Sequence, residues 1–363
     1  MKQKLVYAVS AIFAVSLGII YILDARNITS AIGDAIDICL YTICPSLFGY
    51  MFVGSFLVRT GLSGVVFKPL YFLFGRLFRF TEEEFSIFVL SLVGGYPLGA
   101  RLTAEYIPDT NTRAKFRAFC YCPSPPFIIG VIGYGVFGSQ AIGVRCWLCC
   151  VFGCVCYALF TRRNAMPVSE KTPLLYNTRV SDAIIKSVNS AGVGLFYVSA
   201  MIVFFSTVKE ALRCTLAAIG LNLPDTARQI IFSLLEISSV KNVNAAFNPE
   251  IIFIFCAALS SFGGLCVAFQ VLSLSGGGVN TMRFFGARLA SAMLAAFAAA
   301  VSLEISPIIP NIRSVTGIIF SKTGSPYPSI ALLAMCLLVC IGEKQAIPKP
   351  KITSNKPSQL GLY

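Results

Sequence analysis

The sequence has 363 residues, of which 56% are hydrophobic and only 12% are charged. Its mean hydropathy of +0.78 is too high for a soluble globular domain, so the composition predicts a protein dissolved in the lipid bilayer. The formal net charge of +13 does not indicate nucleic acid as a partner, because the basic residues are scattered through short loops between apolar runs. We therefore expect a multi-pass membrane protein in which basic loops set the topology.

The cysteines and the absence of histidine argue against metal, redox and acid–base chemistry. Most of the 14 cysteines lie inside apolar runs, where cysteine is a small packing residue. Cys146 and Cys149 have the spacing of a metal or redox pair, but no second pair of that kind accompanies them. Without histidine, and with acidic residues mostly in loops, the chain offers no plausible acid and base pair. We expect no cofactor, no metal and no enzymatic activity.

Apolar runs of about 20 residues, the length that crosses about 30 Å of hydrocarbon, recur along the chain. The first run resembles a signal peptide, but no small-residue cleavage site follows it, and Asp24-Ala25-Arg26 comes directly after. We interpret it as a retained signal anchor. The predicted spans are 5–23, 32–58, 118–137, 141–160, 183–207, 250–272, 284–305 and 326–342.

Loops rich in lysine and arginine stay on the cytoplasmic side, which assigns a side to each connection. Both termini are then cytoplasmic, and the amphipathic stretch 62–80 lies on the inner surface. The stretch 85–104 starts and ends inside, and 226–247 is too short and polar to cross, so both are predicted re-entrant hairpins. Four charged residues near span ends are expected at the membrane interface: Asp34, Asp37, Lys186 and Arg288.

Two segments read alike, with Ala-Ile and Leu-Phe at the same spacing in 35–51 and in 183–199. The first begins outside and the second inside, which is the inverted repeat typical of secondary transporters. Chance similarity between apolar segments is the alternative. The fold class predicted is all-α, with about eight transmembrane helices plus two re-entrant hairpins in an inverted repeat. The predicted parts are an anchor helix (1–30), a first repeat (31–160), a cytoplasmic loop (161–181), a second repeat (182–306), a last transmembrane helix (307–343) and a disordered cytoplasmic tail (344–363).

Glycine, proline and serine interrupt the apolar segments at 94–101, 122–126, 236–239 and 260–264. Non-helical backbone at membrane depth is tolerated only where protein buries it or where it lines a wet cavity. A half-helix that starts at such a break points free N–H groups at the cavity, which favours an anion, and Arg101 would grip a carboxylate. The alternatives are that the glycines serve helix packing, that Arg101 reaches to the interface and that Glu236 satisfies a helix end. The candidate substrate-binding residues are Gly94, Gly95, Tyr96, Pro97, Gly99, Arg101, Ser124, Pro125, Glu236, Ser238, Ser239, Ser260, Ser261, Gly263 and Gly264.

The motifs at 45–48 (Pro-Ser-Leu-Phe), 95–104, 124–130, 235–238 and 261–265 resemble those of the sporulation integral membrane protein YlbJ family, also called SpoVV, with its nucleoside-recognition gate domains. The resemblance implies a multi-pass protein of a forespore membrane that carries dipicolinic acid into the spore. Two departures weaken the transfer of roles. Cys120-Tyr121-Cys122 stands where Asn and Ser are expected, and Ser238 and Ser239 stand where Thr and Gly are expected.

Our hypothesis from the sequence is a secondary transporter of dipicolinate or another small dicarboxylate that works by alternating access. Backbone N–H groups at the breaks and Arg101 would hold the carboxylates, and Tyr96 would stack on the ring. Besides this small anionic substrate, the expected partners are the lipid bilayer, a coupling ion and a second copy of the chain. A non-transporting sporulation membrane scaffold and a nucleoside or cation symporter are the alternatives.

Overall fold

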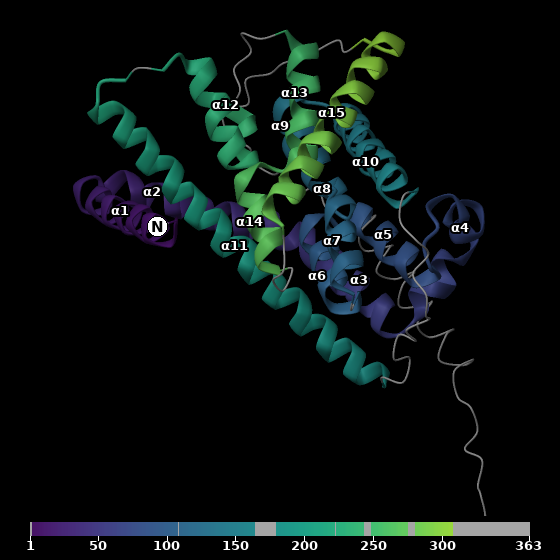
Figure 1. Ribbon diagram of the computed structural model, residues 1–363. Coiled ribbons are helices and arrows are strands. Elements are labelled where there is room, and N and C mark those ends of the chain that lie inside the picture. Colours follow the sequence, from purple (N-terminus) through teal and green to yellow (C-terminus); the bar gives the residue numbers. More distant parts are fainter. Residues whose placement is uncertain are drawn as a thin grey trace, which may run out of the picture. The chain divides into compact units, whose positions relative to one another are not determined.

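The computed structural model describes residues 2–107, 109–163, 179–221, 223–242, 248–274 and 280–307 (Figure 1). All of them belong to one compact unit, Met1–Val315, and they form helices joined by short connections, with no strand in these ranges. The predicted span 326–342, the predicted tail and most of the predicted central loop lie outside the described residues.

The elements follow one another in a simple order. They are α1 (Lys2–Leu23), α2 (Ala25–Ile38), η1 (Cys39–Ile43), α3 (Cys44–Arg59), α4 (Leu62–Phe78), α5 (Glu82–Gly94), α6 (Tyr96–Tyr106), α7 (Thr110–Phe119), α8 (Pro125–Phe127), η2 (Ile128–Tyr134), α9 (Gly135–Phe137), α10 (Gln140–Arg163), α11 (Val180–Ala218), α12 (Asp225–Leu235), η3 (Ile237–Asn242), α13 (Pro249–Phe262), α14 (Gly264–Leu274) and α15 (Thr281–Ile305).

Five helical stretches within the described residues are long and apolar enough to cross a bilayer. With the absence of strands from the same residues, they confirm the predicted all-α, polytopic membrane protein. The apolar helices Ser10–Leu23 and Pro125–Phe137, at two other predicted spans, are shorter. The five long stretches are Ala25–Arg59, Gln140–Thr161, Val180–Ala218, Pro249–Leu274 and Thr281–Ile305.

Two of the long stretches extend beyond the spans predicted from hydrophobicity. The first begins at Ala25, seven residues before the predicted start of the span 32–58. Helix α11 continues through charged residues to Ala218, where Arg213 pairs with Glu210 at 2.6 Å and lies 3.8 Å from Asp24. Paired charges are tolerated at a helix end where a hydrophobicity window stops. The sequence therefore placed these helices well and their ends less well.

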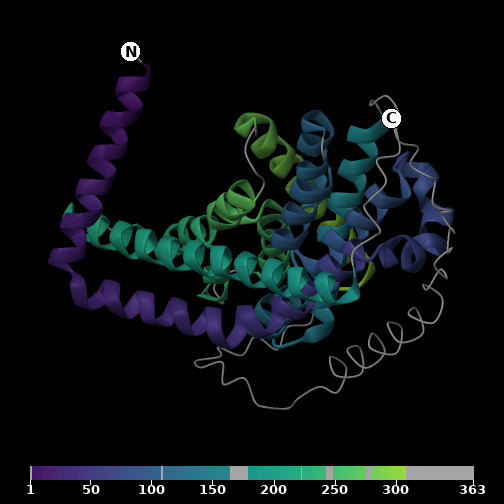
Figure 2. The same cartoon turned by 90° about the horizontal axis from the view of Figure 1, so that it is seen from below.

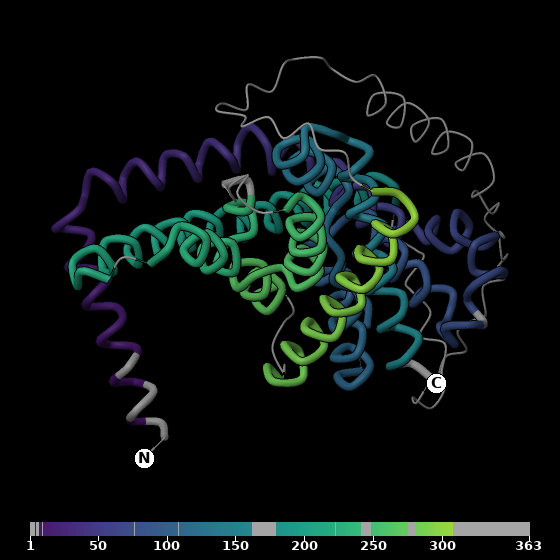
Figure 3. Tube along the Cα trace, turned by 90° about the horizontal axis from the view of Figure 1, so that it is seen from above, coloured from purple at the N-terminus to yellow at the C-terminus, as the bar shows by residue number. Residues whose placement is uncertain are grey.

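Helix α11 lies alongside the continuous helical stretch formed by α2, η1 and α3. These two long elements are visible in Figure 2. The contact is close because Gly194 of α11 faces Met51 of α3, and a Cβ at this glycine would overlap the methionine methyl group. Helices α10, α13 and α15 form a second packed group, which Figure 3 shows as neighbouring tubes in teal, green and yellow-green. Small residues at such contacts are the usual means by which membrane helices approach one another.

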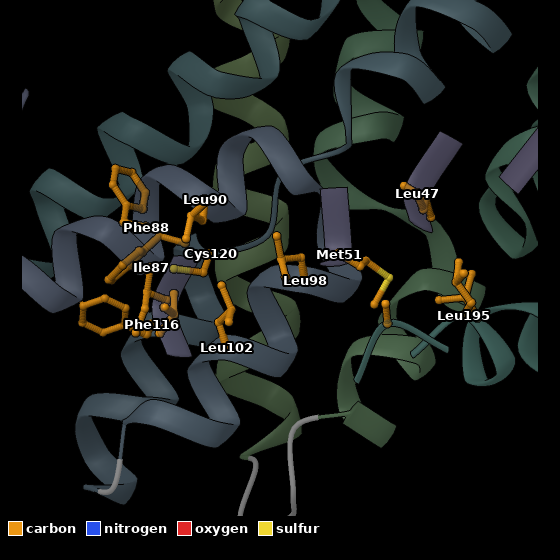
Figure 4. Close-up of a cluster of buried hydrophobic side chains, with 14 of the residues drawn as sticks. Leu47, Met51, Ile87, Phe88, Leu90, Leu98, Leu102, Phe116, Cys120 and Leu195 are labelled. Carbon is orange, nitrogen blue, oxygen red and sulfur yellow. The ribbon is translucent and has the colours of Figure 1, made fainter. Parts of the chain in front are cut away.

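A cluster of aromatic rings, which we call the phenylalanine cluster, joins α4, α5 and α7. Its rings lie 4.7 to 6.3 Å apart, centroid to centroid, in stacked, tilted and edge-on pairs. Figure 4 shows two of them, Phe88 and Phe116, beside Ile87, Leu90 and Cys120. The cluster fixes α5 at its N-terminal half. Its members are Phe78, Phe80, Phe85, Phe88, Phe116 and Phe119.

The predicted stretch 62–80 is a helix, α4, whose apolar side chains are largely exposed. Val65 and Leu73 are each 69% exposed. Because an exposed apolar face of this size is unfavourable in water, we assign it to lipid. A short loop follows α4, and after it Thr81 and Glu84 form a capping box at the start of α5. The Glu84 carboxylate accepts a hydrogen bond from the Thr81 N–H at 2.9 Å.

Candidate functional site

The first break separates α5 from α6 at Gly95. Its φ of +85° with an extended ψ of −179° is open to glycine and strained for other residues. Helix α6 restarts at Tyr96 with Pro97 in its first turn, where the missing N–H of proline costs nothing. A Cβ on Gly95 would lie 2.9 Å from the Ser124 Cβ. The first break is therefore packed directly on the second.

The second break is the non-helical stretch between α7 and α8, from Cys120 to Ser124. Prolines at 123 and 125 explain it, because the residue before a proline is driven out of the helical region. The stretch is buried throughout, and Tyr121 is among the largest fully buried side chains. The break predicted at 122–126 within the span 118–137 is thus present, and it begins two residues earlier, at Cys120, so that a continuous helix starts only at Pro125.

The third break follows α12, where Glu236 adopts an extended conformation and is only 3% exposed. Its carboxylate accepts hydrogen bonds from the Ser238 N–H at 2.9 Å, the Ser238 hydroxyl at 2.5 Å and the Ser239 hydroxyl at 3.3 Å. Lys209 of α11 donates to the Ser239 Oγ at 3.1 Å. The break therefore solvates a buried carboxylate with its own polar groups, as a buried charge requires.

The fourth break separates α13 from α14 at two glycines with positive φ, Gly263 at 89° and Gly264 at 69°. Gly263 lies against the Tyr121 hydroxyl, and Gly264 faces the carbonyl oxygen of Leu234, just ahead of the third break. The Tyr96 hydroxyl donates a hydrogen bond to the Ser260 carbonyl. Each of the four breaks therefore touches another, although they lie up to 170 residues apart in the sequence.

A partly open cavity of about 50 Å³ is lined by residues of the first three breaks. A water molecule needs about 10–15 Å³ of such volume, so the cavity has room for a few waters or an ion in this conformation. Apolar side chains from α2, η1, α11 and α14 complete the wall. Its polar lining residues are Ser46, Tyr96, Ser124, Glu236, Ser238 and Gln270.

The structure divides the predicted site residues into three groups. Tyr96, Pro97, Ser124, Glu236 and Ser238 line the cavity. A second group lies in the breaks behind this lining: Gly94, Gly95, Gly99, Pro125, Ser239, Ser260, Ser261, Gly263 and Gly264.

Arg101 belongs to neither group. It lies on α6, is partly exposed, and its guanidinium comes within 3.6 Å of the position that a Cβ on Gly194 would occupy, on α11. It is not part of the cavity wall. Two polar lining residues outside the predicted set are Ser46, beside Pro45 at the start of α3, and Gln270, an amide within the apolar α14. An amide within an apolar helix is the feature by which the sequence could have revealed Gln270.

Two wide, π-helical turns adjoin the cavity. Turn η1 interrupts the helix between α2 and α3, and Ile38 and Ile43 at its ends line the cavity. Pro45 follows it and lacks an N–H, so a wide turn here avoids the clash between the proline ring and the preceding carbonyl. Turn η2 follows the second break, after the lining residue Phe127. Wide turns of this kind are frequent at functional sites.

One prediction is wrong in a way that matters for the site. Arg288, expected at the membrane interface, is fully buried in α15. Its Nη1 donates to the Tyr121 carbonyl at 3.2 Å, and its guanidinium lies 4.3 Å from the centre of the Tyr121 ring. The interfacial assignment considered only the distance to the end of the span, whereas a charge within an apolar run is by itself an indication of function.

Broken helices that meet at a cavity, within long apolar helices, define a polytopic helical membrane protein. No family model, curated protein or solved structure matches this chain. The resemblance to the YlbJ family thus stays a prediction.

Proposed function

We propose that this protein is a secondary transporter that moves a small solute through the membrane by alternating access. The observation that supports this proposal is that three broken segments line one cavity and the fourth packs directly against them. Broken helices that expose backbone groups near the middle of the bilayer are the usual substrate and ion sites of secondary transporters. A packing role alone would not place a carboxylate and several hydroxyl groups in the wall of a cavity.

The charge of the cavity wall bears on the coupling ion. Among the described residues, the wall contains the Glu236 carboxylate and no lysine or arginine. The Lys209 ammonium lies outside the wall, where it donates to Ser239. A proton or a metal cation bound at Glu236 would further reduce the repulsion of a dicarboxylate by this group. We therefore propose that Glu236 binds the coupling proton or cation, and that the substrate enters with it.

The proposed substrate is dipicolinate, as the resemblance implies. The protein would lie in a forespore membrane, with both of its termini in the cytoplasm. The cavity of about 50 Å³ is too small for an aromatic dicarboxylate. The substrate would bind in a conformation in which the broken segments have separated, as alternating access requires. Tyr96 and Phe127, both in the wall, offer rings on which a pyridine could stack.

Purified protein in sealed vesicles tests this proposal. We expect uptake of labelled dipicolinate that rises when a proton gradient points inward, and at least a tenfold loss of gradient-driven uptake in Glu236→Gln. Glu304→Gln is the matched control, because Glu304 is an exposed carboxylate at the end of α15. Equal uptake by vesicles with and without protein would contradict the proposal.

A nucleoside or cation symporter is the second candidate, and the buried carboxylate beside Gln270 and the serines favours it. Such a wall can accept and donate hydrogen bonds to sugar hydroxyl groups. The same vesicles, tested with nucleosides and with sodium in place of protons, separate the two candidates. If neither solute moves while Glu236→Gln still supports sporulation, a non-transporting scaffold is the better interpretation.

A further inference from the structure

Arg288 is a buried charge that the proposed transport site does not use. It lies within a membrane-spanning helix and is fully buried, yet it forms no ion pair with a carboxylate in the described part of the chain. Charges at such positions are strongly unfavourable unless something compensates them, and in membrane proteins they pair or bind ligands. Its neighbours in the described part of the chain are the Tyr121 carbonyl, the Tyr121 and Phe284 rings and the Cys154 thiol, and none of them is a carboxylate.

Hydrogen-bond donors are left over at this place. The Nε and Nη2 of Arg288 have no partner among the described residues, and neither has the Tyr121 hydroxyl. Ser291, one turn further along α15, has an unpartnered buried hydroxyl as well. So has Ser261, two residues before the glycine that contacts the Tyr121 hydroxyl. A guanidinium together with free hydroxyl groups favours a negative ligand and disfavours a cation.

We propose that Arg288 and the Tyr121 hydroxyl belong to an internal site for a small anion, one aromatic layer behind the cavity. The Tyr121 ring lies 4.7 Å from the ring of Tyr96, which lines the cavity. The guanidinium carbon of Arg288 lies 4.3 Å from the centre of the Tyr121 ring, so ring contacts through Tyr121 and Tyr96 connect the charge to the cavity wall. An anion bound there would satisfy donors that protein groups leave free and would compensate the buried charge.

The ligand chemistry has two sources: a halide from solution, or a carboxylate of the transported solute. Both would be held by the same guanidinium donors. The halide source does not depend on the proposed function, whereas the carboxylate source rests on it. The experiment therefore needs one arm for each.

The test uses the full-length protein in detergent and measures its melting temperature against chloride, with gluconate keeping the ionic strength constant. A ligand that binds only the folded state raises the melting temperature in a saturable way. We expect this rise for the wild type, its loss in Arg288→Met, and at least a tenfold weaker chloride dependence in Arg288→Lys, which keeps the charge without the planar fork. The melting temperature of Arg288→Met in gluconate should equal or exceed that of the wild type, because the buried charge is gone.

Arg145→Met is the matched control. Arg145 also lies in a membrane-spanning helix, but its donors are occupied by the Ser302 hydroxyl at 3.0 Å and the Ser302 carbonyl. Its chloride response should match that of the wild type. If Arg288→Met does not fold, equilibrium binding of radiolabelled chloride and of dipicolinate to the wild type and to Arg288→Lys decides: a saturable site for either anion that is at least tenfold weaker in Arg288→Lys supports the proposal, and no saturable binding of both anions, or equal binding in the two proteins, overturns it.

The second arm repeats the titration with dipicolinate. A rise that competes with chloride supports the same site with the solute as the ligand. A rise with dipicolinate alone, lost in Arg288→Met, supports the carboxylate source. No response of the wild type to either anion, or an equal response in Arg288→Met, overturns the proposal and indicates that the neighbouring Cys154 thiol or water compensates the charge. Vesicle uptake is measured separately, so a failure of transport leaves these results unaffected.

Discussion

The phenylalanine cluster and the region around Arg288 are equally well buried but differ in their polar atoms. We call the second region the polar centre and define it as Tyr121, Ser260, Ser261, Arg288 and Ser291. The cluster contains only carbon side chains whose rings contact one another. Every residue of the polar centre has at least one side-chain N or O atom that is buried without a hydrogen-bond partner in the described part of the chain. Such atoms destabilise a fold and are retained where function needs them.

The two regions are connected through helices α5 and α6. Phe85 and Phe88 hold the N-terminal part of α5, the helix ends at the Gly95 break, and the ring of Tyr96 directly after it lies 4.7 Å from the ring of Tyr121 in the polar centre. The phenylalanine cluster therefore fixes α5, and α5 in turn fixes the position of the Gly95 break. The comparison predicts that damage to the cluster lowers stability, whereas removing polar groups from the centre changes binding more than stability.

The largest expected effect is that of Phe119→Ala, which removes a fully buried ring from the cluster. We expect a loss of about 3–5 kcal/mol in the free energy of unfolding, as is usual for buried phenylalanines. Unfolding in detergent and denaturant mixtures measures it. Phe160→Ala is the control, because Phe160 is 69% exposed on α10 and should change stability little. Similar losses in both variants would remove the distinction between core and lipid-facing rings.

Gly263→Ala should cost about 1–3 kcal/mol, because φ is +89° and the added Cβ overlaps the Tyr121 hydroxyl. Tyr121→Phe in the same chain should restore part of this loss by removing the hydroxyl. Gly286→Ala on α15 is the control, since a Cβ there meets nothing within 4 Å. If the double variant is no more stable than Gly263→Ala, the ring atoms and the backbone, and not the hydroxyl, set the cost.

The smallest effect is expected for Ser261→Ala, which removes an unpartnered hydroxyl from the polar centre. Its stability should stay within about 0.5 kcal/mol of the wild type or rise, because no hydrogen bond is lost. Ser91→Ala is its counterpart on α5, where the hydroxyl donates to the Phe88 carbonyl at 2.6 Å, and it should cost about 1 kcal/mol. Thermal unfolding compares the two variants, and a larger loss at Ser261 would show that its hydroxyl has a partner in solution.

Much of the architecture could be predicted because hydrophobic length and helix-breaking residues are local properties of the sequence. The long apolar runs became helices, and the clusters of glycine, proline and serine became the four breaks. Helix ends were less predictable. At Ala25 and Ala218 the helices run on through polar residues, which ion pairs stabilise and a hydropathy average does not count.

The contacts of the charged residues were not predictable in the same way. Arg101 and Arg288 look alike in the sequence, since each is an arginine within an apolar stretch. The structure places Arg101 on a partly exposed face of α6 and Arg288 against Tyr121, and that difference depends on which helix packs beside each residue. Packing of this kind joins residues 167 positions apart, and no local pattern records it.

The wide turns η1 and η2 give the long helices a property that an ideal helix lacks. Each has hydrogen bonds that span five residues where those of an α-helix span four, so it holds one extra residue. The extra residue can move along the chain when a neighbouring five-residue bond forms and a four-residue bond breaks. Each step rotates the one residue that the wide turn passes, by about 100° around the helix axis. For η1, whose flanking Ile38 and Ile43 line the cavity, a single step would turn one of these side chains out of the wall while the rest of the helix stays in place.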